Sequence, residues 1–498
     1  MWALWLAVHA ATLAIDGTTA PYALLGAVSM GALLAGTGLG GLAMGRAGSL
    51  RVGIGSGLGA GILALLLLGA KVVQQPESTD EMTEAANQLR PDWLAIVFGF
   101  LAVCTLVGAV GGLVGGISAP RERAGPGADR WLAWFGVIAT AAMLPVIMVG
   151  GAVTSTESGM AVPDGVTSYG AFSALFPISL MSEPRIFLEH SHRLFGTLVG
   201  LTALALAFAT AARQGWAKSK GILIGLAFIV PTLAAWVLRE RGEIGVGATV
   251  AVLGVCAVGS LGWTHAMISR GKAPAAAMGL VCLVLVQGAL GATRVSDALV
   301  AIAAVHGVFA QFVFATGAMV AALLFSRLHA GAPLDEATTS TARSTRKLAL
   351  IALIITSIQL IFGAMARHFD SMHSVLTHAG FAFVVIIMAI LAGSACRRAG
   401  AGDPIGRALR RTGAAMFVIV VLQFTLGWGA FIATQMGGTA RPVPDATELA
   451  QAHPLPVGEA IVTTAHQTGG ALLIALIALG VFWSRRAARG AAESPRNA

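Results

Sequence analysis

Long apolar segments recur along almost the whole chain, and they constrain the fold more than any other feature of the sequence. An α-helix needs about 20 mainly apolar residues to cross a bilayer. Of the 498 residues, 56% are hydrophobic and only 11% are charged, and the mean hydropathy is +0.80. Because backbone polar groups in lipid must bond within the chain, such segments form helices. The sequence therefore predicts an all-α polytopic membrane protein.

We interpret about 14 apolar segments as membrane spans, each of them near the length that a bilayer requires. The first segment is shorter than the others. The segments are 2–15, 21–45, 52–74, 93–118, 131–153, 189–212, 221–238, 244–268, 277–293, 299–326, 348–366, 372–395, 412–434 and 460–483.

The 32 Lys and Arg residues, which leave a net charge of +9, cluster in short loops such as "RERAGPGADR", "RSTRK" and "SRRAARG". If the N-terminus is cytoplasmic, most of them fall in or beside inside loops, as the positive-inside rule requires. The charge then reports topology and not a nucleic-acid partner. The N-terminus lacks the features of a cleaved signal peptide. We expect a multi-pass protein of a bacterial-type inner membrane, surrounded by lipid, with both termini cytoplasmic.

Four predicted spans that run from outside to inside begin with a histidine in their first two turns. These residues are His192, His306, His378 and His466. Because the four helices start from the same face, equal positions along them mean equal depth. We expect the four imidazoles to form one layer near the outer leaflet.

A repeat surrounds these histidines. A glutamine is followed four residues later by a glycine and nineteen residues later by the histidine in two cases: Gln287, Gly291 and His306, and Gln359, Gly363 and His378. Gln423 and Gly427 repeat the first step before His466, whereas "VGGAVT" replaces it before His192. Repeats of one orientation suggest two similar four-helix-bundle halves related by an axis along the membrane normal.

Imidazole is a good axial ligand for haem iron, and a helical bundle can present two imidazoles from facing helices. Zinc would need about four converging ligands, yet no carboxylate or thiolate accompanies three of the histidines. Two bis-histidine haem sites therefore fit best, and four unrelated structural histidines are the alternative. The cysteines, which show no close spacing, are interpreted as packing residues: Cys104, Cys256, Cys282 and Cys396.

The stretch "FLEHSHRLFG" places Glu189 and His192 three residues apart, hence on one helix face. The carboxylate could then lie beside a haem bound by His192, and Arg193 could pair with a haem propionate. His190 points to nearly the opposite side and is interpreted as a loop or interface residue. Two further arginines at outer helix ends are weaker propionate partners and more typical of interfacial anchors: Arg294 and Arg367.

On these residues the sequence resembles the haem A synthase family of membrane enzymes over about residues 128–483. The resemblance rests on "GGAVTSTESGMAVPD", on the E-x-x-H-R motif that begins at Glu189, on "QGALGATRV" followed by "VHGVFAQF", on the unit from Gln359 to His378, and on "HQTGG" at His466. Together, and in this order at these helix ends, the motifs are specific.

The resemblance implies an eight-helix core and an oxidoreductase that converts the C8 methyl group of haem O to a formyl group, giving haem A for terminal oxidase assembly. By analogy, His192 and His306 would hold the substrate haem with Arg193 nearby. His378 and His466 would hold a b-type haem, and Glu189 would be the catalytic carboxylate. The ligand metal would be haem iron at all four histidines.

The chain departs from the family in three respects. Residues 1–120 form an N-terminal transmembrane extension of unknown role. Within the N-terminal half of the core, 128–328, two spans at 221–268 appear as an insertion; the C-terminal half is 345–485, followed by a cytoplasmic tail at 486–498. The cysteine pair that some members carry in the first outer loop of the core is absent from this sequence.

The alternative from another functional class is a non-catalytic membrane diheme protein, either a haem carrier or an electron-transfer cytochrome. Glu189 discriminates between the two, because an electron carrier has no need of a carboxylate beside a haem ligand. For the enzyme, the partners to expect are a haem O synthase and an electron-transfer protein. The sequence leaves a homo-oligomer open.

Overall fold

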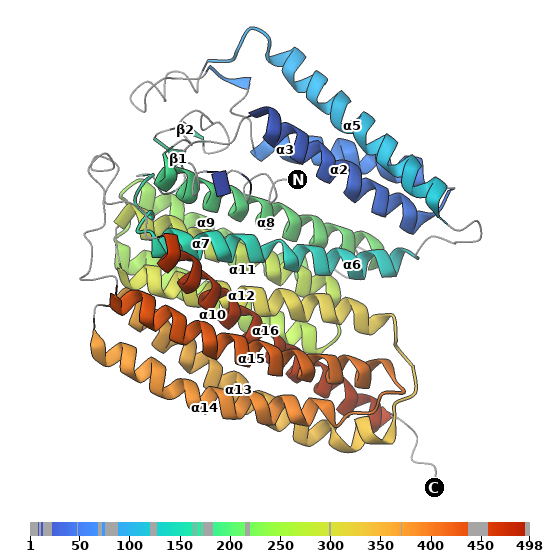
Figure 1. Ribbon diagram of the computed structural model, residues 1–498, viewed down its shortest axis with the longest axis vertical. Coiled ribbons are helices and arrows are strands. Elements are labelled where there is room, and N and C mark those ends of the chain that lie inside the picture. Colours follow the sequence, from blue (N-terminus) through green and yellow to red (C-terminus); the bar gives the residue numbers. More distant parts are fainter. Residues whose placement is uncertain are drawn as a thin grey trace. The chain divides into compact units, whose positions relative to one another are not determined.

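The computed structural model describes residues 8, 11–12, 22–46, 48–67, 72–74, 88–119, 127–162, 165, 167–169, 171–172, 183–214, 220–297, 300–369, 371–436 and 457–493. These residues are almost entirely helical (Figure 1). The elements are α2 (Tyr22–Met44), α3 (Ser49–Leu67), α5 (Trp93–Ser118), α6 (Ala128–Ala141), α7 (Met143–Ser155), β1 (Thr167–Ser168), β2 (Ala171–Phe172), α8 (Pro184–Gln214), α9 (Lys220–Glu240), α10 (Val246–Ser269), α11 (Ala273–Asp297), α12 (Val300–Arg327), α13 (Glu336–His368), α14 (Met372–Arg397), α15 (Pro404–Met436) and α16 (Val457–Glu493).

Within the described ranges, 12 helices are long and apolar enough to cross a membrane, with α6 and α7 forming one span. The chain is therefore an all-α, multi-pass membrane protein, as predicted. Of the 14 predicted spans, 221–238 is a helix, α9, but is not among those 12. The segment 2–15 lies outside the described residues, apart from residues 8 and 11–12.

Several helices continue well beyond the predicted apolar segments. The span predicted at 348–366 belongs to a helix that begins at Glu336, the one at 412–434 begins at Pro404, and the one at 460–483 ends at Glu493. The added turns are rich in Ala, Arg and Lys, which favour helix in water as well as in lipid. Hydropathy locates the part of a helix inside the membrane and not the whole helix.

Pro145 explains why one span is divided into α6 and α7. A proline within a helix has no N–H to donate and its ring clashes with the carbonyl four residues earlier. That carbonyl belongs to Ala141, the last residue of α6, and α7 begins at Met143. The break therefore falls where the proline disturbs the backbone.

The chain divides into two compact units, each described here by itself. Unit 1 contains residues 1–128, 157–198 and 443–457, and unit 2 contains residues 129–156, 199–442 and 458–498. In unit 1, α5 packs against both α2 and α3 through glycines. A Cβ at Gly108 would lie 2.7 Å from the Cα of Gly57 on α3, so only glycine allows this approach of the two backbones.

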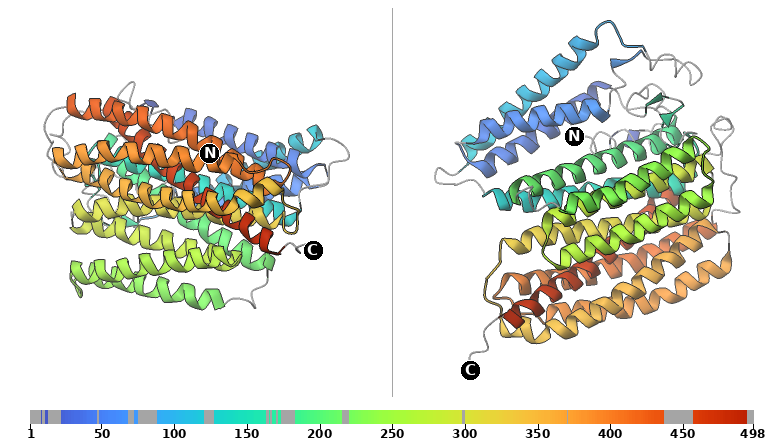
Figure 2. Two further views of the ribbon diagram at one scale, coloured as in Figure 1. Left: turned by 90° about the horizontal axis from the view of Figure 1, so that it is seen from below. Right: turned by 180° about the vertical axis from the view of Figure 1, so that it is seen from behind.

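In unit 2, the helices α9 to α16 run alongside one another, and consecutive helices pack as neighbours through most of the series (Figures 1 and 2). One apolar core centres on α11, α12 and α16 and includes Leu283, Val320 and Ile474. A second core includes Ala389, Met416 and Ile477 from α14, α15 and α16. Helix α16 therefore contributes to both cores.

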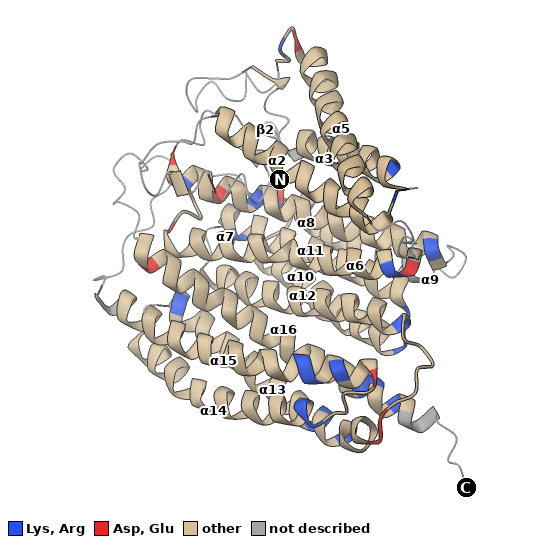
Figure 3. Ribbon diagram, turned by 45° about the vertical axis from the view of Figure 1, so that its right-hand side comes forward, with Lys and Arg blue, Asp and Glu red and all other residues tan. Residues whose placement is uncertain are grey.

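Basic residues gather at one end of α13, α14, α15 and α16 (Figure 3). They belong to the starts of α13 and α15 and to the ends of α14 and α16, which meet because neighbouring helices run in opposite directions. Arg410 of α15, for example, donates a hydrogen bond of 2.8 Å to the carbonyl of Arg397 on α14. This distribution follows the charge pattern from which cytoplasmic loops were predicted.

Candidate functional site

Three of the four predicted histidines lie in unit 2, each within a recurring arrangement that we call a Gln-Gly-His module. One helix carries a glutamine and, four residues later, a glycine, and the next helix in the chain carries the histidine within its first three turns. The modules are Gln287, Gly291 and His306 on α11 and α12; Gln359, Gly363 and His378 on α13 and α14; and Gln423, Gly427 and His466 on α15 and α16.

The glycine of each module makes room for the imidazole. A Cβ added at Gly291 or Gly363 would lie 2.9 Å from Cε1 of the histidine in the same module, and one added at Gly427 would lie 3.0 Å from it. Any larger residue would push the ring aside. The sequence repeat is therefore also a repeat of side-chain packing, with the same ring edge against the same backbone position.

The glutamine of each module reaches the same histidine. Gln287 Nε2 donates to the carbonyl oxygen of His306 at 3.0 Å and lies 3.1 Å from its Nδ1. Gln359 Nε2 donates to the carbonyl oxygen of His378 at 2.9 Å. In the third module, Gln423 Nε2 lies 3.5 Å from Nε2 of His466. Each glutamine thus links two consecutive helices at the level of the histidine.

His378 and His466 lie close together. Their ring centres are 6.0 Å apart and the ring planes make an angle of 89°. In both residues Nδ1 is buried and meets no hydrogen-bond partner among the described residues. Two half-buried imidazoles with unmatched nitrogen atoms therefore converge between α14 and α16, beside the side chains of Gln359 and Gln423.

The spacing of this pair suits a metal ion held between two imidazoles. When each metal–nitrogen bond is about 2 Å, two ring centres on opposite sides of one ion lie about 6 Å apart. No group of three or more His, Cys, Asp or Glu residues that could hold a bare metal ion occurs in the described part of the chain. A metal ion held by this pair would need further ligands of its own, as the iron of a porphyrin has. The two residues therefore fit a bis-histidine haem.

The other predicted haem site divides between the units. His306 is half-buried in unit 2, whereas the half-buried His192 lies on the part of α8 that belongs to unit 1. The pairing of these two histidines stays a prediction. Gly151, from the "VGGAVT" stretch that precedes His192 in place of a glutamine step, faces Thr464 and Gln467 of α16.

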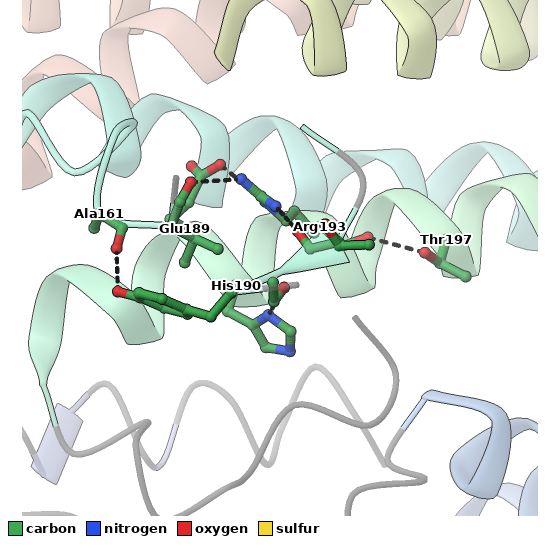
Figure 4. A network of polar contacts seen from close by, with 9 residues as sticks. Ala161, Glu189, His190, Arg193 and Thr197 are labelled. Carbon is green, nitrogen blue, oxygen red and sulfur yellow. Dashed lines mark hydrogen bonds and ion pairs between the residues drawn. The ribbon is translucent and has the colours of Figure 1, made fainter. Parts of the chain in front are cut away.

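Glu189 and Arg193 form a buried ion pair one helical turn apart on α8 (Figure 4). Arg193 Nε lies 3.2 Å from Glu189 Oε1, and the exposed fractions of the two side chains are 12% and 3%. The second carboxylate oxygen, Oε2, is buried without a partner among the described residues. One oxygen of Glu189 is thus held and the other is available.

Arg193 also anchors the segment that precedes α8. Its NH1 and NH2 groups donate hydrogen bonds of 2.7 Å to the carbonyl of Thr167 and 2.9 Å to that of Val162. Thr167 belongs to β1, which pairs antiparallel with β2. A guanidinium can hold several acceptors in a fixed plane. The pairing of Arg193 with a haem propionate stays a prediction beside this observed role.

His190, which the sequence assigned to a loop or interface, is buried against the same segment. Its Nδ1 lies 3.3 Å from Oγ of Ser168 in β1. Tyr169, the next residue, donates from its hydroxyl group to the carbonyl of Ala161 at 2.8 Å (Figure 4). The E-H-S-H-R stretch therefore fastens the β hairpin to the start of α8.

His265 and Arg367 have partners away from the histidine pair. His265 Nε2 lies 3.2 Å from Oγ1 of Thr316, ten residues beyond His306 on α12, or about 15 Å at the rise of an α-helix. Arg367 donates from NH2 to the carbonyl of Thr154 at 2.6 Å. Arg294 is half-buried at the end of α11. His265 therefore lies at a different level of the bundle from His306.

Sequence reasoning identified the module glutamines only as spacing markers and did not include Gln311. This residue follows His306 by five positions and is 7% exposed, and its Oε1 has no partner among the described residues. A Cβ at Gly470 would lie 3.6 Å from that oxygen and 3.4 Å from Gln423 Nε2. The sequence did offer a signal for Gln311: it is an uncharged polar residue inside an apolar span. Such a residue needs a hydrogen-bond partner in lipid.

Comparison with models of protein families, with curated proteins and with solved structures finds no match to this chain.

Proposed function

We propose that this chain is a membrane haem enzyme similar to haem A synthase, which oxidises the C8 methyl group of haem O to a formyl group. The observation that carries the proposal is the pair of imidazoles at His378 and His466, with ring centres 6.0 Å apart. A pair at this distance inside a membrane bundle favours iron held by a porphyrin over a bare ion. The fold that supports it is a multi-pass helical bundle.

His378 and His466 would hold a b-type haem, which when bound supplies one-electron transfer. Their module glycines, Gly363 and Gly427, leave the space that fixes each ring. Apolar side chains of α14, α15 and α16 pack into the second core on the same helices, which would limit the access of water to the haem. His192 and His306 would hold the substrate haem O near the outer face.

Glu189 is the residue proposed to accept a proton. Oxidation of a methyl group removes hydrogen, so a basic atom must lie near the reacting carbon. Glu189 Oε2 is buried without a partner among the described residues, while Oε1 is held by Arg193. Arg193 would thereby orient the carboxylate and leave one oxygen for the proton. Its place three residues before His192 puts both side chains on one helix face.

A second candidate is a non-catalytic diheme protein. The observation that favours it is the role of Arg193 in the fold, since Arg193 binds the carbonyls of Val162 and Thr167 and has Glu189 as its buried counter-ion. Glu189 would then be structural. The two candidates share the histidine ligands and differ only in whether haem O is changed.

Haem extraction from the protein expressed with a source of haem O distinguishes the candidates. The enzyme yields hydroxylated or formylated product, whereas the carrier yields unchanged haem O at normal loading. Glu189→Gln should keep the haem and stop product formation. Product formation that continues at the wild-type rate in Glu189→Gln would remove Glu189 from the mechanism.

The haem ligands are tested by absorption spectra of purified variants. His378→Ala and His466→Ala should each lose the b-type spectrum. The matched control is His265→Ala, because His265 is another histidine inside a span but bonds Thr316. A b-type spectrum that survives both His378→Ala and His466→Ala would refute the site.

The proposed reaction places the protein in an inner membrane of bacterial type, between a haem O synthase that supplies the substrate and a terminal oxidase that takes haem A. When water supplies the oxygen atom of the formyl group, the oxidation releases protons and electrons, so an electron-accepting partner is needed as well. Lipid surrounds the spans, and the basic helix ends of unit 2 would face the cytoplasm under the positive-inside rule.

A further inference from the structure

We propose that Gln359 is a positioning residue for His378, one of the two histidines of the proposed haem b site. Its amide Oε1 accepts the Nδ1 proton of the His378 imidazole, so that Nε2 of the ring keeps its lone pair for iron. The inference rests on the proposed function, because it concerns residues that would ligate haem.

The first support is a match between unsatisfied groups. In the second module, Oε1 of Gln359 and Nδ1 of His378 are both buried without a partner among the described residues; in the third module the same holds for Gln423 and His466. Buried polar atoms in folded proteins are nearly always hydrogen-bonded. In the second module, one acceptor and one ring nitrogen that can carry a proton therefore remain, and the proposal pairs them.

The second support is that the amide is already held at the histidine. Gln359 Nε2 donates to the backbone carbonyl of His378 at 2.9 Å. Gln423 instead lies with its Nε2 3.5 Å from Nε2 of His466, so the proposal is made for Gln359 alone. The terminal torsion of a glutamine has a broad energy profile, so the amide turns at little cost.

The third support is the chemistry of the imidazole. A neutral ring carries one proton, and the nitrogen that keeps it is set by the hydrogen bond which that nitrogen makes. An acceptor at Nδ1 selects the form in which Nε2 can bind a metal, fixes the ring plane and makes the ligand more basic. Helix α14 and helix α16 each present such a ring, and the sequence places one glutamine against each.

A purely structural glutamine would link the two helices and leave the electronic state of the ring unchanged. The reduction potential of bound haem separates these roles. Removing the acceptor makes the imidazole a weaker donor, which stabilises ferric iron less and moves the potential to more positive values. A stronger acceptor at the same place moves it to more negative values.

The first experiment titrates haem b into the purified full-length protein and measures its potential in Gln359→Leu and Gln359→Glu. Gln359→Leu should bind haem about 10- to 100-fold more weakly, with a more positive potential. Gln359→Glu should restore the affinity and shift the potential to more negative values. The matched control is Gln467→Leu, because Gln467 lies beside His466 in sequence but faces Gly151. Its potential should equal that of the wild type.

The second experiment needs no haem. Nitrogen-15 spectra of the histidine-labelled, haem-free protein report which ring nitrogen carries the proton, and the signals of His378 are identified by their loss in His378→Asn. The wild type should hold the proton on Nδ1 of His378. Gln359→Leu should shift the ring toward a mixture of the two forms, whereas Gln467→Leu should not.

The outcomes separate this inference from the proposed function. A wild-type protein that binds no haem refutes the function, and the nitrogen spectra still decide the role of Gln359. Wild-type potential and affinity in Gln359→Leu, or a His378 ring whose proton distribution ignores Gln359, would overturn the inference. If Gln359→Leu does not fold, Gln359→Glu still tests the role of Gln359, through the direction in which it shifts the reduction potential of the bound haem.

Discussion

Ser155 at the end of α7 and Thr463 near the start of α16 share a hydrogen bond of 2.7 Å between their hydroxyl oxygens, although 308 residues separate them. One turn away on α7, a Cβ at Gly151 would lie 3.1 Å from Oε1 of Gln467. These contacts fall on both sides of His466 in the sequence of α16. Helix α7, from the start of unit 2 in the sequence, therefore contacts α16 on both sides of His466.

The glycine of a module is expected to be essential for the ring that it faces. In Gly363→Ala, the new Cβ would lie 2.9 Å from Cε1 of His378, so the ring must move and haem affinity should fall about 10-fold or more. Haem titration followed by absorption measures this change. Gly380→Ala is the control, because a Cβ at Gly380, two residues after the histidine, meets nothing within 4 Å. Equal haem affinities in the two variants would contradict the packing seen in the module.

Loss of the buried cation beside Glu189 is expected to destabilise unit 1 strongly. Arg193→Ala leaves Glu189 buried without its partner and releases two backbone carbonyls, at a cost of about 3–5 kcal/mol. Thermal unfolding in detergent measures this loss. The control is Arg213→Ala, whose pair with Asp129 has side chains that are 51% and 61% exposed. An exposed pair contributes about 1 kcal/mol at most. Similar losses in both variants would show that the pair in unit 1 is not buried.

The glycine contact between α3 and α5 is expected not to tolerate even one methyl group. In Gly108→Ala, the added Cβ would lie 2.7 Å from the Cα of Gly57, and overpacking of this kind costs about 1–3 kcal/mol. Cross-linking or unfolding of the N-terminal helices in the full-length protein would detect the loosening. Gly99→Ala on the same helix has open space around it, so it should be neutral or slightly stabilising. The prediction fails if the two variants unfold alike.

The start of α8 is expected to become less stable as the pH rises above the ordinary range of a glutamate. Burial raises the pKa of Glu183 above 4.5, despite a hydrogen bond of 2.6 Å that its Oε2 accepts from the backbone N–H of Ile186. A raised folded-state pKa means that the folded chain binds the proton more tightly than the unfolded chain does. The stabilisation is therefore complete below 4.5 and is lost as the pH passes the raised pKa.

The comparison of the wild type with Glu183→Gln isolates this titration. The variant keeps an acceptor for Ile186 but does not titrate. The free energy of unfolding of the wild type, measured relative to the variant, should fall as the pH rises above 4.5 and passes the raised pKa of Glu183. A rise over the same interval would mean that the hydrogen bond to Ile186 outweighs burial in setting the pKa.

Much of the fold could be predicted because lipid restricts the backbone to helices. The span at 93–118 matches α5 to the residue, and the predicted pair 221–238 and 244–268 corresponds to α9 and α10. The prediction was less accurate at the ends of α13 and α16, where helix continues into polar sequence that hydropathy does not recognise. The number of spans was predicted as about 14, and 12 helices within the described residues meet the criteria.

For the site, the sequence determined which residues repeat. The spacing of Gln287, Gly291 and His306 is a property of the chain alone, and it implies equal depth because an α-helix has a constant rise. Sequence also marked Glu189 and Arg193 as charges too costly for a span without a partner. It could not show that Arg193 donates hydrogen bonds to the carbonyls of Val162 and Thr167. Those carbonyls belong to the segment before α8, whose position depends on the fold.

Only the tertiary structure decided which histidines meet. His378 and His466 are 88 residues apart, and no periodicity within α14 or α16 requires their rings to approach. Their distance results from how α16 packs into both cores of unit 2 and against α7. Helix content and depth follow from local hydropathy and helical geometry, whereas the pairing of side chains depends on packing between distant segments, which a single sequence does not record.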